Sequence, residues 1–153
     1  MMSTVTPFQT VGPYWSIGLR VGLQSPPIDP SNRVVIRGRL LDGAGTGIPD
    51  GILEWWHPAF TSVQRSTTEN AGSFLIETMK APHIAVRVLG RGILTHYVTR
   101  LYFADDPDTA TDPVLNLVPQ HRRHTLLAQP TSASEYAFDV IIQGENETVF
   151  FDI

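Results

Sequence analysis

The chain contains no cysteine, which excludes disulfide bonds and thiolate metal sites. It also lacks the run of about twenty apolar residues that a membrane helix requires. The first residues, Met1–Pro7, lack the basic start and apolar run of a signal peptide, and we expect a cytoplasmic location. A formal net charge of −4 offers no positive field for a polyanion. We therefore predict that the chain binds neither nucleic acid nor a membrane.

What is present favours a globular protein. Hydrophobic residues make up 42% of the 153 positions and charged residues only 17%, so the chain can bury a core of its own. Residues 1–30 hold five of the 12 prolines and show no sustained period, which predicts an N-terminal arm. Residues 31–153 are then a single domain.

The periodicity of that domain is mostly two, the period of a half-buried strand. One strand begins at residue 33, and further strands are predicted over residues 52–56, 74–78, 83–89, 95–103, 136–143 and 148–152. Residues 61–72 are polar and predict a loop, while Pro119 to about Leu127 predicts a helix with proline in its first turn. The predicted fold class is all-β: an antiparallel β-sandwich with an N-terminal arm and one short helix.

The segment 80–92 carries the most informative pattern. On a strand, residues i and i+2 point to the same face, so His83 and position 85 are neighbours. Two imidazoles in these positions commonly share one metal ion, but position 85 is alanine. The strand is therefore either a metal-binding strand that lacks a ligand or no metal site at all.

The other histidines carry no predicted catalytic role. His121 and His124 lie on the predicted helix with two arginines between them, which favours a solvated helix face over a metal site. His57 is expected to end a strand, and nothing near His96 marks it as a ligand. No Ser-His-Asp arrangement, Gly-x-Ser-x-Gly elbow or glycine-rich phosphate loop occurs.

One arginine stands out by its neighbours. Arg91 lies between Gly90 and Gly92, where the backbone is free to turn its guanidinium outward. An exposed loop cation is the ordinary interpretation of such a residue. A planar guanidinium on a turn is also the group that proteins use to recognise carboxylates.

Eight segments stand out when they are taken together in their order and spacing: Thr10–Tyr14, Val35–Asp42, Glu54–Trp56, Ala81–Ile84, Thr99–Phe103, Asp112–Leu115, Phe138–Glu145 and Glu147–Asp152. In this order they resemble the intradiol ring-cleavage dioxygenases, and the resemblance covers nearly the whole chain. Within that family the chain is similar to the α-type chains, which pair with an iron-bearing β-type chain.

The resemblance implies where iron is bound and where it is not. Two tyrosinates and the histidines of a His-x-His strand hold Fe(III) in the family's catalytic chain, and anionic oxygen suits this hard cation. His83 matches the first histidine, and Ala85 replaces the second. No tyrosine occurs between Trp56 and His83, and the four tyrosines of the chain lie at other positions: Tyr14, Tyr97, Tyr102 and Tyr136. The resemblance thus implies that this chain binds no metal, that His83 is a vestigial ligand position, and that Fe(III) belongs to a β-type partner subunit.

The same resemblance implies a role for this chain in the partner's pocket. An α-type chain closes one wall of the active site, with residues that correspond here to Thr10, Gly12, Pro13, Tyr14 and Arg91. The substrate would be a catechol, 3,4-dihydroxybenzoate, which the complex cleaves between its hydroxyls with O2 to give 3-carboxy-cis,cis-muconate. The carboxylate of that substrate gives Arg91 a physical role, while this chain itself contributes no catalytic residue.

Two alternatives stay open. The stretch from His57 to Lys80 is shorter than the corresponding loops of the family, and those loops help to build the contact between the two chain types. The chain could instead be a stand-alone, non-enzymatic β-sandwich binding or assembly protein, or a metalloenzyme with a relocated site. Exposed apolar residues such as Trp15, Trp55 or Trp56 would favour the subunit.

Overall fold

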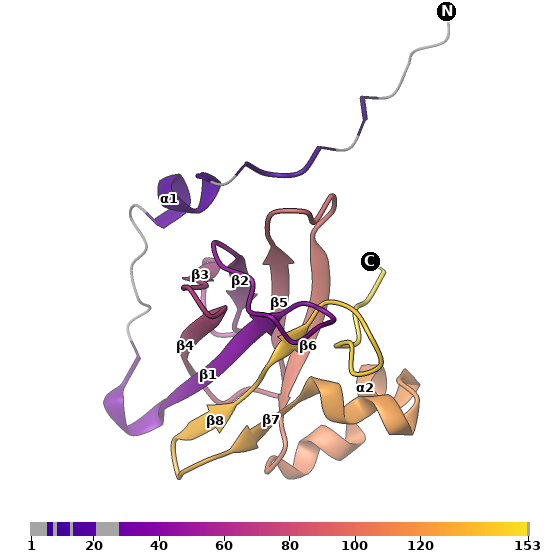
Figure 1. The fold of residues 1–153 in the computed structure, drawn as a ribbon. Coiled ribbons are helices and arrows are strands. Elements are labelled where there is room, and N and C mark those ends of the chain that lie inside the picture. The colour runs from indigo at the N-terminus through magenta and orange to yellow at the C-terminus, as the bar shows by residue number, and fades with distance from the viewer. Residues whose placement is uncertain (1–5, 8, 13, 21–27, 153) are drawn as a thin grey trace, which may run out of the picture.

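The computed structural model describes residues 6–7, 9–12, 14–20 and 28–152, and its body is a single curled sheet (Figure 1). Its strands follow the order β3-β2-β5-β6-β7-β8-β1-β4, with β9 paired to β1 off this path. The strands are β1 (Arg33–Leu41), β2 (Ile52–Trp56), β3 (Gln64–Thr67), β4 (Ser73–Met79), β5 (Ile84–Leu89), β6 (Tyr97–Phe103), β7 (Leu127–Pro130), β8 (Glu135–Ala137) and β9 (Val140–Ile141). The helices are α1 (Trp15–Arg20), α2 (Pro113–Leu117) and the 3-10 turns η1 (Pro30–Asn32), η2 (Pro107–Thr111) and η3 (Gln120–Leu126).

Alternating burial explains the longest strand pair. In β1, Val34, Ile36 and Leu40 are buried while Arg37 and Arg39 face solvent, as the period of two predicts. The strand pairs antiparallel with β4 along almost its full length. The all-β class is confirmed.

The pairing is mixed, and this corrects the expectation of a wholly antiparallel fold. β1 pairs in parallel with β8 and β9, and β6 pairs in parallel with β7. Parallel neighbours need a crossover rather than a tight turn, and here the segment that carries η2, α2 and η3 connects β6 to β7. Local periodicity does not distinguish the two pairing modes. The division at residue 30 into arm and domain stays a prediction.

The predicted strand 136–143 is divided in two. β8 pairs with residues 35–37 of β1 and β9 with residues 40–41, so the register is interrupted beside Gly38. A side chain at Gly38 would collide with the carbonyl group of Phe138, so only glycine fits this close approach. Asp139 fills the interruption, because its carboxylate accepts the backbone N–H of Arg39 at 2.8 Å.

The expectation of one short helix is wrong in number and type. The predicted 119–127 segment forms η3, a 3-10 turn, and α1 and α2 are additional helices. Asp112 caps α2 and Pro113 occupies its first turn, which is a favourable start for a helix. Val118 is extended, as expected for a residue before proline, so α2 ends before Pro119 and does not continue into η3.

Two further boundaries differ from the prediction. Residues 148–152 form no strand, although Thr148 donates its N–H to Ile141 and Phe151 donates its N–H to Val98, each at 2.8 Å. The predicted loop 61–72 contains the edge strand β3. The hydroxyl of Ser66 on β3 donates to the carbonyl of Leu75 on β4, which links the two edge strands of the sheet.

Two buried clusters form the core. The larger lies between the inner faces of the curled sheet and includes Ile36, Leu53, Ile84 and Phe103. The smaller packs Leu115 and Leu126 onto the ring of Tyr102, on the opposite face of β6 from Phe103. The α2–η3 segment therefore covers the outer face of the sheet beside β6.

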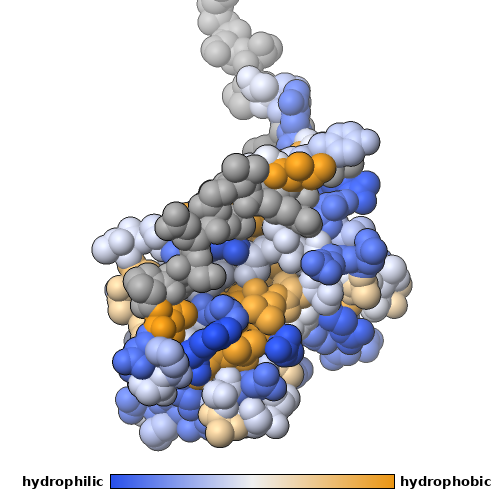
Figure 2. All heavy atoms as spheres, turned by 90° about the vertical axis from the view of Figure 1, so that its left-hand side faces the viewer, coloured by the Kyte–Doolittle hydropathy of each residue, from blue (hydrophilic) through white to orange (hydrophobic). Residues whose placement is uncertain are grey.

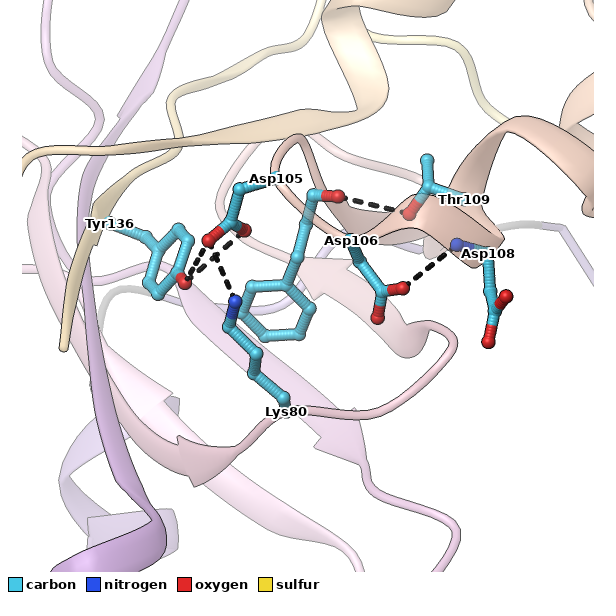
Figure 3. A network of polar contacts seen from close by, with 7 residues as sticks. Lys80, Asp105, Asp106, Asp108, Thr109 and Tyr136 are labelled. Carbon is cyan, nitrogen blue, oxygen red and sulfur yellow. Dashed lines mark hydrogen bonds and ion pairs between the residues drawn. The ribbon is translucent and has the colours of Figure 1, made fainter. Parts of the chain in front are cut away.

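A network of polar contacts connects three segments at one end of this sheet (Figure 3). The ammonium of Lys80 lies 2.7 Å from the carboxylate of Asp105, which also accepts the hydroxyl of buried Tyr136 at 3.0 Å. The Lys80 side-chain hydrogen bond holds the pKa of Asp105 below its ordinary value, although burial acts in the opposite direction. The network joins the chain before β5, the chain after β6, and β8.

Candidate functional site

Strand pairing around Ala85 fixes what surrounds it. β5 pairs antiparallel with both β2 and β6, so Ala85 lies opposite Trp56 on one side and Arg100 on the other. Directly opposite residues of antiparallel strands project from the same face of the sheet. His83 lies two positions before Ala85, just outside β5, and is half-buried. In the family's pattern, position 85 carries the second imidazole. Here it carries a methyl group, and the guanidinium of Arg100 lies beside it.

Asp112 organises the polar groups on this face. Its carboxylate accepts the hydroxyl of Tyr102 at 2.9 Å. The same oxygen accepts the backbone N–H groups of Val114 and Leu115 at 2.9 and 2.8 Å, which caps α2. A nitrogen of Arg100 lies 4.0 Å from the other carboxylate oxygen and donates to the Tyr102 hydroxyl at 3.4 Å. The three side chains form one network under the cover of α2.

The charges of this network shift the neighbouring pKa values. Burial raises the pKa of Tyr102 to about 12, so its hydroxyl stays protonated. Burial also acts to raise the pKa of Asp112, but the hydrogen bonds it accepts and the charge of Arg100 outweigh this and hold the pKa below its ordinary value. Burial and the Arg100 charge lower the pKa of His83, and its ring lies 5.9 Å from that of Tyr102 between centroids. His83 is neutral at pH 7.

These residues do not fit a ferric ion. One imidazole is present, and the phenol beside it, that of Tyr102, donates a hydrogen bond to Asp112 and so offers no anionic oxygen. Asp112 is itself engaged as the cap of α2. Within the part of the chain that the structure describes, no group of three or more histidine, aspartate or glutamate side chains is arranged to hold a metal.

A second charged cluster lies further along the same face. Glu54 accepts a hydrogen bond from Arg65 at 2.7 Å and lies 3.5 Å from Arg87. The Arg87 guanidinium also lies 5.1 Å from the centroid of the Trp56 ring. Arg87 lies two positions after Ala85 and shares its face of the sheet, and it shares the Glu54 carboxylate with Arg65.

The Arg91 turn lies at the end of the paired strands β2 and β5. This pairing places the residues before β2 beside the residues after β5, and a nitrogen of Arg91 lies 3.5 Å from a carboxylate oxygen of Asp50. Gly92 has a φ of 81°, which favours glycine, and its N–H donates to the hydroxyl of Thr10 at 2.8 Å. The turn therefore contacts the N-terminal segment directly.

The structure brings some of the predicted pocket residues together. Thr10 touches the Arg91 turn, although 82 positions separate it from Gly92 in the sequence. Gly12 is exposed, and Tyr14, just before α1, is 77% exposed. Pro13 lies outside the described residues. The pocket roles of all five residues stay predictions.

The remaining histidines lie away from this face or in solvent. His57 directly follows β2, as expected, and is buried, with its ring accepting the N–H of Ala59 at 3.0 Å. His121 and His124 are exposed on η3, which confirms a solvated helix face. His96 is exposed and precedes β6 rather than lying on a strand as expected.

Sequence reasoning missed several residues of these networks, among them Arg100, Asp50 and Asp112. Arg100 lies on a strand, and its local sequence does not indicate a role. Only the register of β5 with β6 shows that it lies beside Ala85. Asp50 acquires its partner through the pairing of β2 with β5. Asp112 could have been found, because an aspartate followed by proline before an apolar stretch is a helix N-cap pattern.

Comparison with known proteins gives a consistent result. The chain is 40% identical to the protocatechuate 3,4-dioxygenase alpha chain of Burkholderia cepacia over 191 aligned positions, which cover 97% of each chain. It is 36% identical to the alpha chain of Pseudomonas putida, covering 96% of each. Identity to the Burkholderia cepacia beta chain is 24%, over 76% of this chain and 66% of that one. The alignments extend beyond 153 positions, so the alpha chains carry insertions relative to this chain.

A solved structure supports the fold. The dioxygenase domain of a dioxygenase carbohydrate-binding protein fusion from Streptomyces sp. SirexAA-E superposes with a TM-score of 0.60 at 22% identity, covering 91% of this chain and 98% of that one. No protein-family model matches the chain. Among the described residues, no helix is long and apolar enough to cross a membrane.

Proposed function

Since this chain belongs to the family of protocatechuate 3,4-dioxygenase alpha chains, we propose that it is the non-catalytic subunit of an intradiol dioxygenase complex. The complex would cleave the ring of 3,4-dihydroxybenzoate between its hydroxyls with O2 and give 3-carboxy-cis,cis-muconate. The observation that carries the proposal is the 40% identity to an alpha chain along nearly the full length of both proteins. The known beta chain to which this chain is also similar represents the partner type.

Iron belongs to the partner in this proposal. At the position where the family's pattern requires a second imidazole, this chain offers the methyl group of Ala85 beside the guanidinium of Arg100. His83 alone provides one neutral ligand, too few for Fe(III). The Fe(III) of a β-type subunit would activate the bound catechol, and this chain's residues would bind and orient that substrate.

Arg91 is the residue that we propose for substrate recognition. It lies on an exposed turn, and its side chain is 48% exposed despite its contact with Asp50. A guanidinium has five N–H donors, so a single contact at 3.5 Å leaves most of them free for the substrate carboxylate. The bond between Thr10 and Gly92 supports placing the arm residues Thr10, Gly12, Pro13 and Tyr14 in the same pocket wall.

Exposed apolar side chains on the arm and on the loop that carries Arg91 support a protein partner. The tryptophans expected to mark that contact do not stand out, because Trp55 is 3% exposed and Trp15 and Trp56 are half-buried. Instead Tyr14, Ile17 and Leu94 are exposed, on the arm and on the loop that carries Arg91. Figure 2 shows apolar surface on the N-terminal segment that projects from the body of the molecule. Burial of these side chains against a partner is favourable.

The proposal is tested by co-expression with an iron-bearing β-type chain from the same organism. We expect a stable complex that turns over 3,4-dihydroxybenzoate. Arg91→Ala should lower kcat/KM for this substrate at least tenfold, because a charge-assisted hydrogen bond is lost, and change turnover of catechol by less than twofold.

A matched control is Arg37→Ala, which removes another exposed arginine with one carboxylate partner, on β1, and should leave both activities unchanged. Equal effects of Arg91→Ala on the two substrates would remove carboxylate recognition from the proposal. A chain that stays separate from every β-type partner would favour the stand-alone binding protein.

A further inference from the structure

Arg100, which lies opposite Ala85, brings a positive charge to this face of the sheet. We propose that Arg100 makes this face of the sheet repel metal cations, so that restoring histidine at position 85 is not sufficient to create a metal site. The loss of the ligand and the gain of a fixed positive charge are then two separate barriers. This inference concerns the isolated chain and does not depend on a partner subunit.

Strand register carries the first part of the argument. Ala85 and Arg100 are direct partners of an antiparallel pair, and Cα atoms of such pairs lie roughly 5 Å apart. A histidine at position 85 would project from the same face as both His83 and Arg100. Any cation bound between His83 and a histidine introduced at position 85 would therefore lie beside the guanidinium.

Two contacts direct the Arg100 guanidinium towards Tyr102 and Asp112. Arg100 is only 29% exposed, and it contacts the hydroxyl of Tyr102 and the carboxylate of Asp112 at 3.4 and 4.0 Å. Asp112 is itself fixed, because the same carboxylate caps α2 and accepts the Tyr102 hydroxyl. These contacts favour a guanidinium position beside position 85 over one in solvent.

Electrostatics gives the direction and size of the effect. At His83 the positive charge of Arg100 outweighs the opposing charge of the Asp112 carboxylate, so a cation bound there is repelled on balance. For a divalent cation about 5 Å from an uncompensated unit charge, this repulsion weakens binding about tenfold even with the screening of bulk water. Besides burial, Arg100 also lowers the pKa of His83, and this effect favours metal binding, because a neutral imidazole binds metal without first losing a proton. Removing Arg100 would therefore increase the competition from protons at His83. Tighter binding after removal of Arg100 would therefore report relief of charge repulsion rather than relief of proton competition.

The experiment measures Zn²⁺ binding by isothermal titration calorimetry at pH 7.5. The variants are Ala85→His, Arg100→Gln and the double variant Ala85→His/Arg100→Gln, with the unsubstituted chain as background. Two imidazoles on one strand face suit Zn²⁺, so the double variant should bind a new equivalent of Zn²⁺ at least tenfold more tightly than Ala85→His alone. Circular dichroism reports whether each variant is folded, and Arg100→Met is a second neutral substitution of similar length in case Arg100→Gln is not.

Two control variants separate local charge from other causes. Ala85→His/Arg100→Lys keeps the charge with a different shape and should bind Zn²⁺ no more tightly than Ala85→His. Ala85→His/Arg65→Gln removes a positive charge from the same face, but two strands away from position 85, and should change the affinity by less than threefold. The inference is wrong if Ala85→His alone binds as tightly as the double variant, or if the double variant binds no better than the unsubstituted chain.

Discussion

Two arginines of one sheet, Arg100 and Arg91, differ in how their charge is used. Arg100 lies under α2, 29% exposed, in contact with the Tyr102 hydroxyl and a carboxylate that is itself 14% exposed. Arg91 lies on a turn beyond β5, 48% exposed, with one carboxylate partner that is 38% exposed. The first charge is satisfied inside the chain, whereas the second remains available to another molecule.

The difference shows where this chain is structurally fixed and where it is free to bind. Burial makes an ion pair costly to break, because each partner left alone is a poorly solvated charge. An exposed pair is worth little, since water replaces either partner. The side chains around Ala85 thus contribute to the stability of the fold, and the proposed recognition site lies at the exposed end of β2 and β5.

Removing Asp112 should have the largest effect on stability. Asp112→Ala takes away the cap of α2 and leaves the Tyr102 hydroxyl and Arg100 without their carboxylate, so we expect the free energy of unfolding to fall by about 3 kcal/mol. Urea denaturation measures this change. Asp112→Asn keeps an oxygen for the cap and should lose only about 1 kcal/mol. A loss below 1 kcal/mol for Asp112→Ala would show that the buried network is not a stabilising one.

The pH dependence of stability should identify the same carboxylate. The folded-state pKa of Asp112 lies below the unfolded value of 3.8, so its ionised form stabilises the fold above pH 3.8. This contribution falls as the pH decreases from 3.8 through the folded-state pKa. The difference in unfolding free energy between the unsubstituted chain and Asp112→Asn should therefore shrink over that range. A constant difference from pH 6 to pH 2.5 would contradict the assignment.

Breaking the exposed pair should leave stability almost unchanged. Arg91→Ala and Asp50→Asn should each alter the free energy of unfolding by less than about 0.5 kcal/mol in urea denaturation. Asparagine suits position 50, because the φ of 58° there is one that asparagine tolerates. A loss above 1 kcal/mol in Arg91→Ala would place Arg91 in the same structural class as Arg100.

The smallest expected effect is local. Thr10→Val removes the hydroxyl that accepts the Gly92 N–H while keeping the side-chain shape, and should not change global unfolding measurably. Hydrogen exchange of the Gly92 amide should become several-fold faster. Thr6→Val offers a matched exposed position on the same segment, and should leave that amide unaffected. Equal exchange in both variants would mean that the arm does not dock on the turn.

Much of the fold was predictable because it depends on local patterns. The alternation of apolar and polar residues identified β1, and β2 lies where a strand was predicted. The proline and aspartate around residue 112 carried the pattern of a helix start, although the helix itself was expected at Pro119. The parallel pairings of β1 were not predictable, because identical alternation suits either direction. The split between β8 and β9 depends on a close approach at Gly38 that involves residues a hundred positions apart.

The sequence by itself determined which groups are available. The side chain of Ala85 cannot ligate a metal in any fold, no tyrosine occurs between Trp56 and His83, and Arg91 lies between two glycines. Only the tertiary structure decided which groups meet: it placed Arg100 beside Ala85, Asp112 over Tyr102, and Thr10 against Gly92. The physical reason is that side-chain chemistry is a property of each residue, whereas sheet register and burial arise from contacts between distant segments. Those contacts made one arginine part of a partly buried network and left the other exposed beside a single carboxylate.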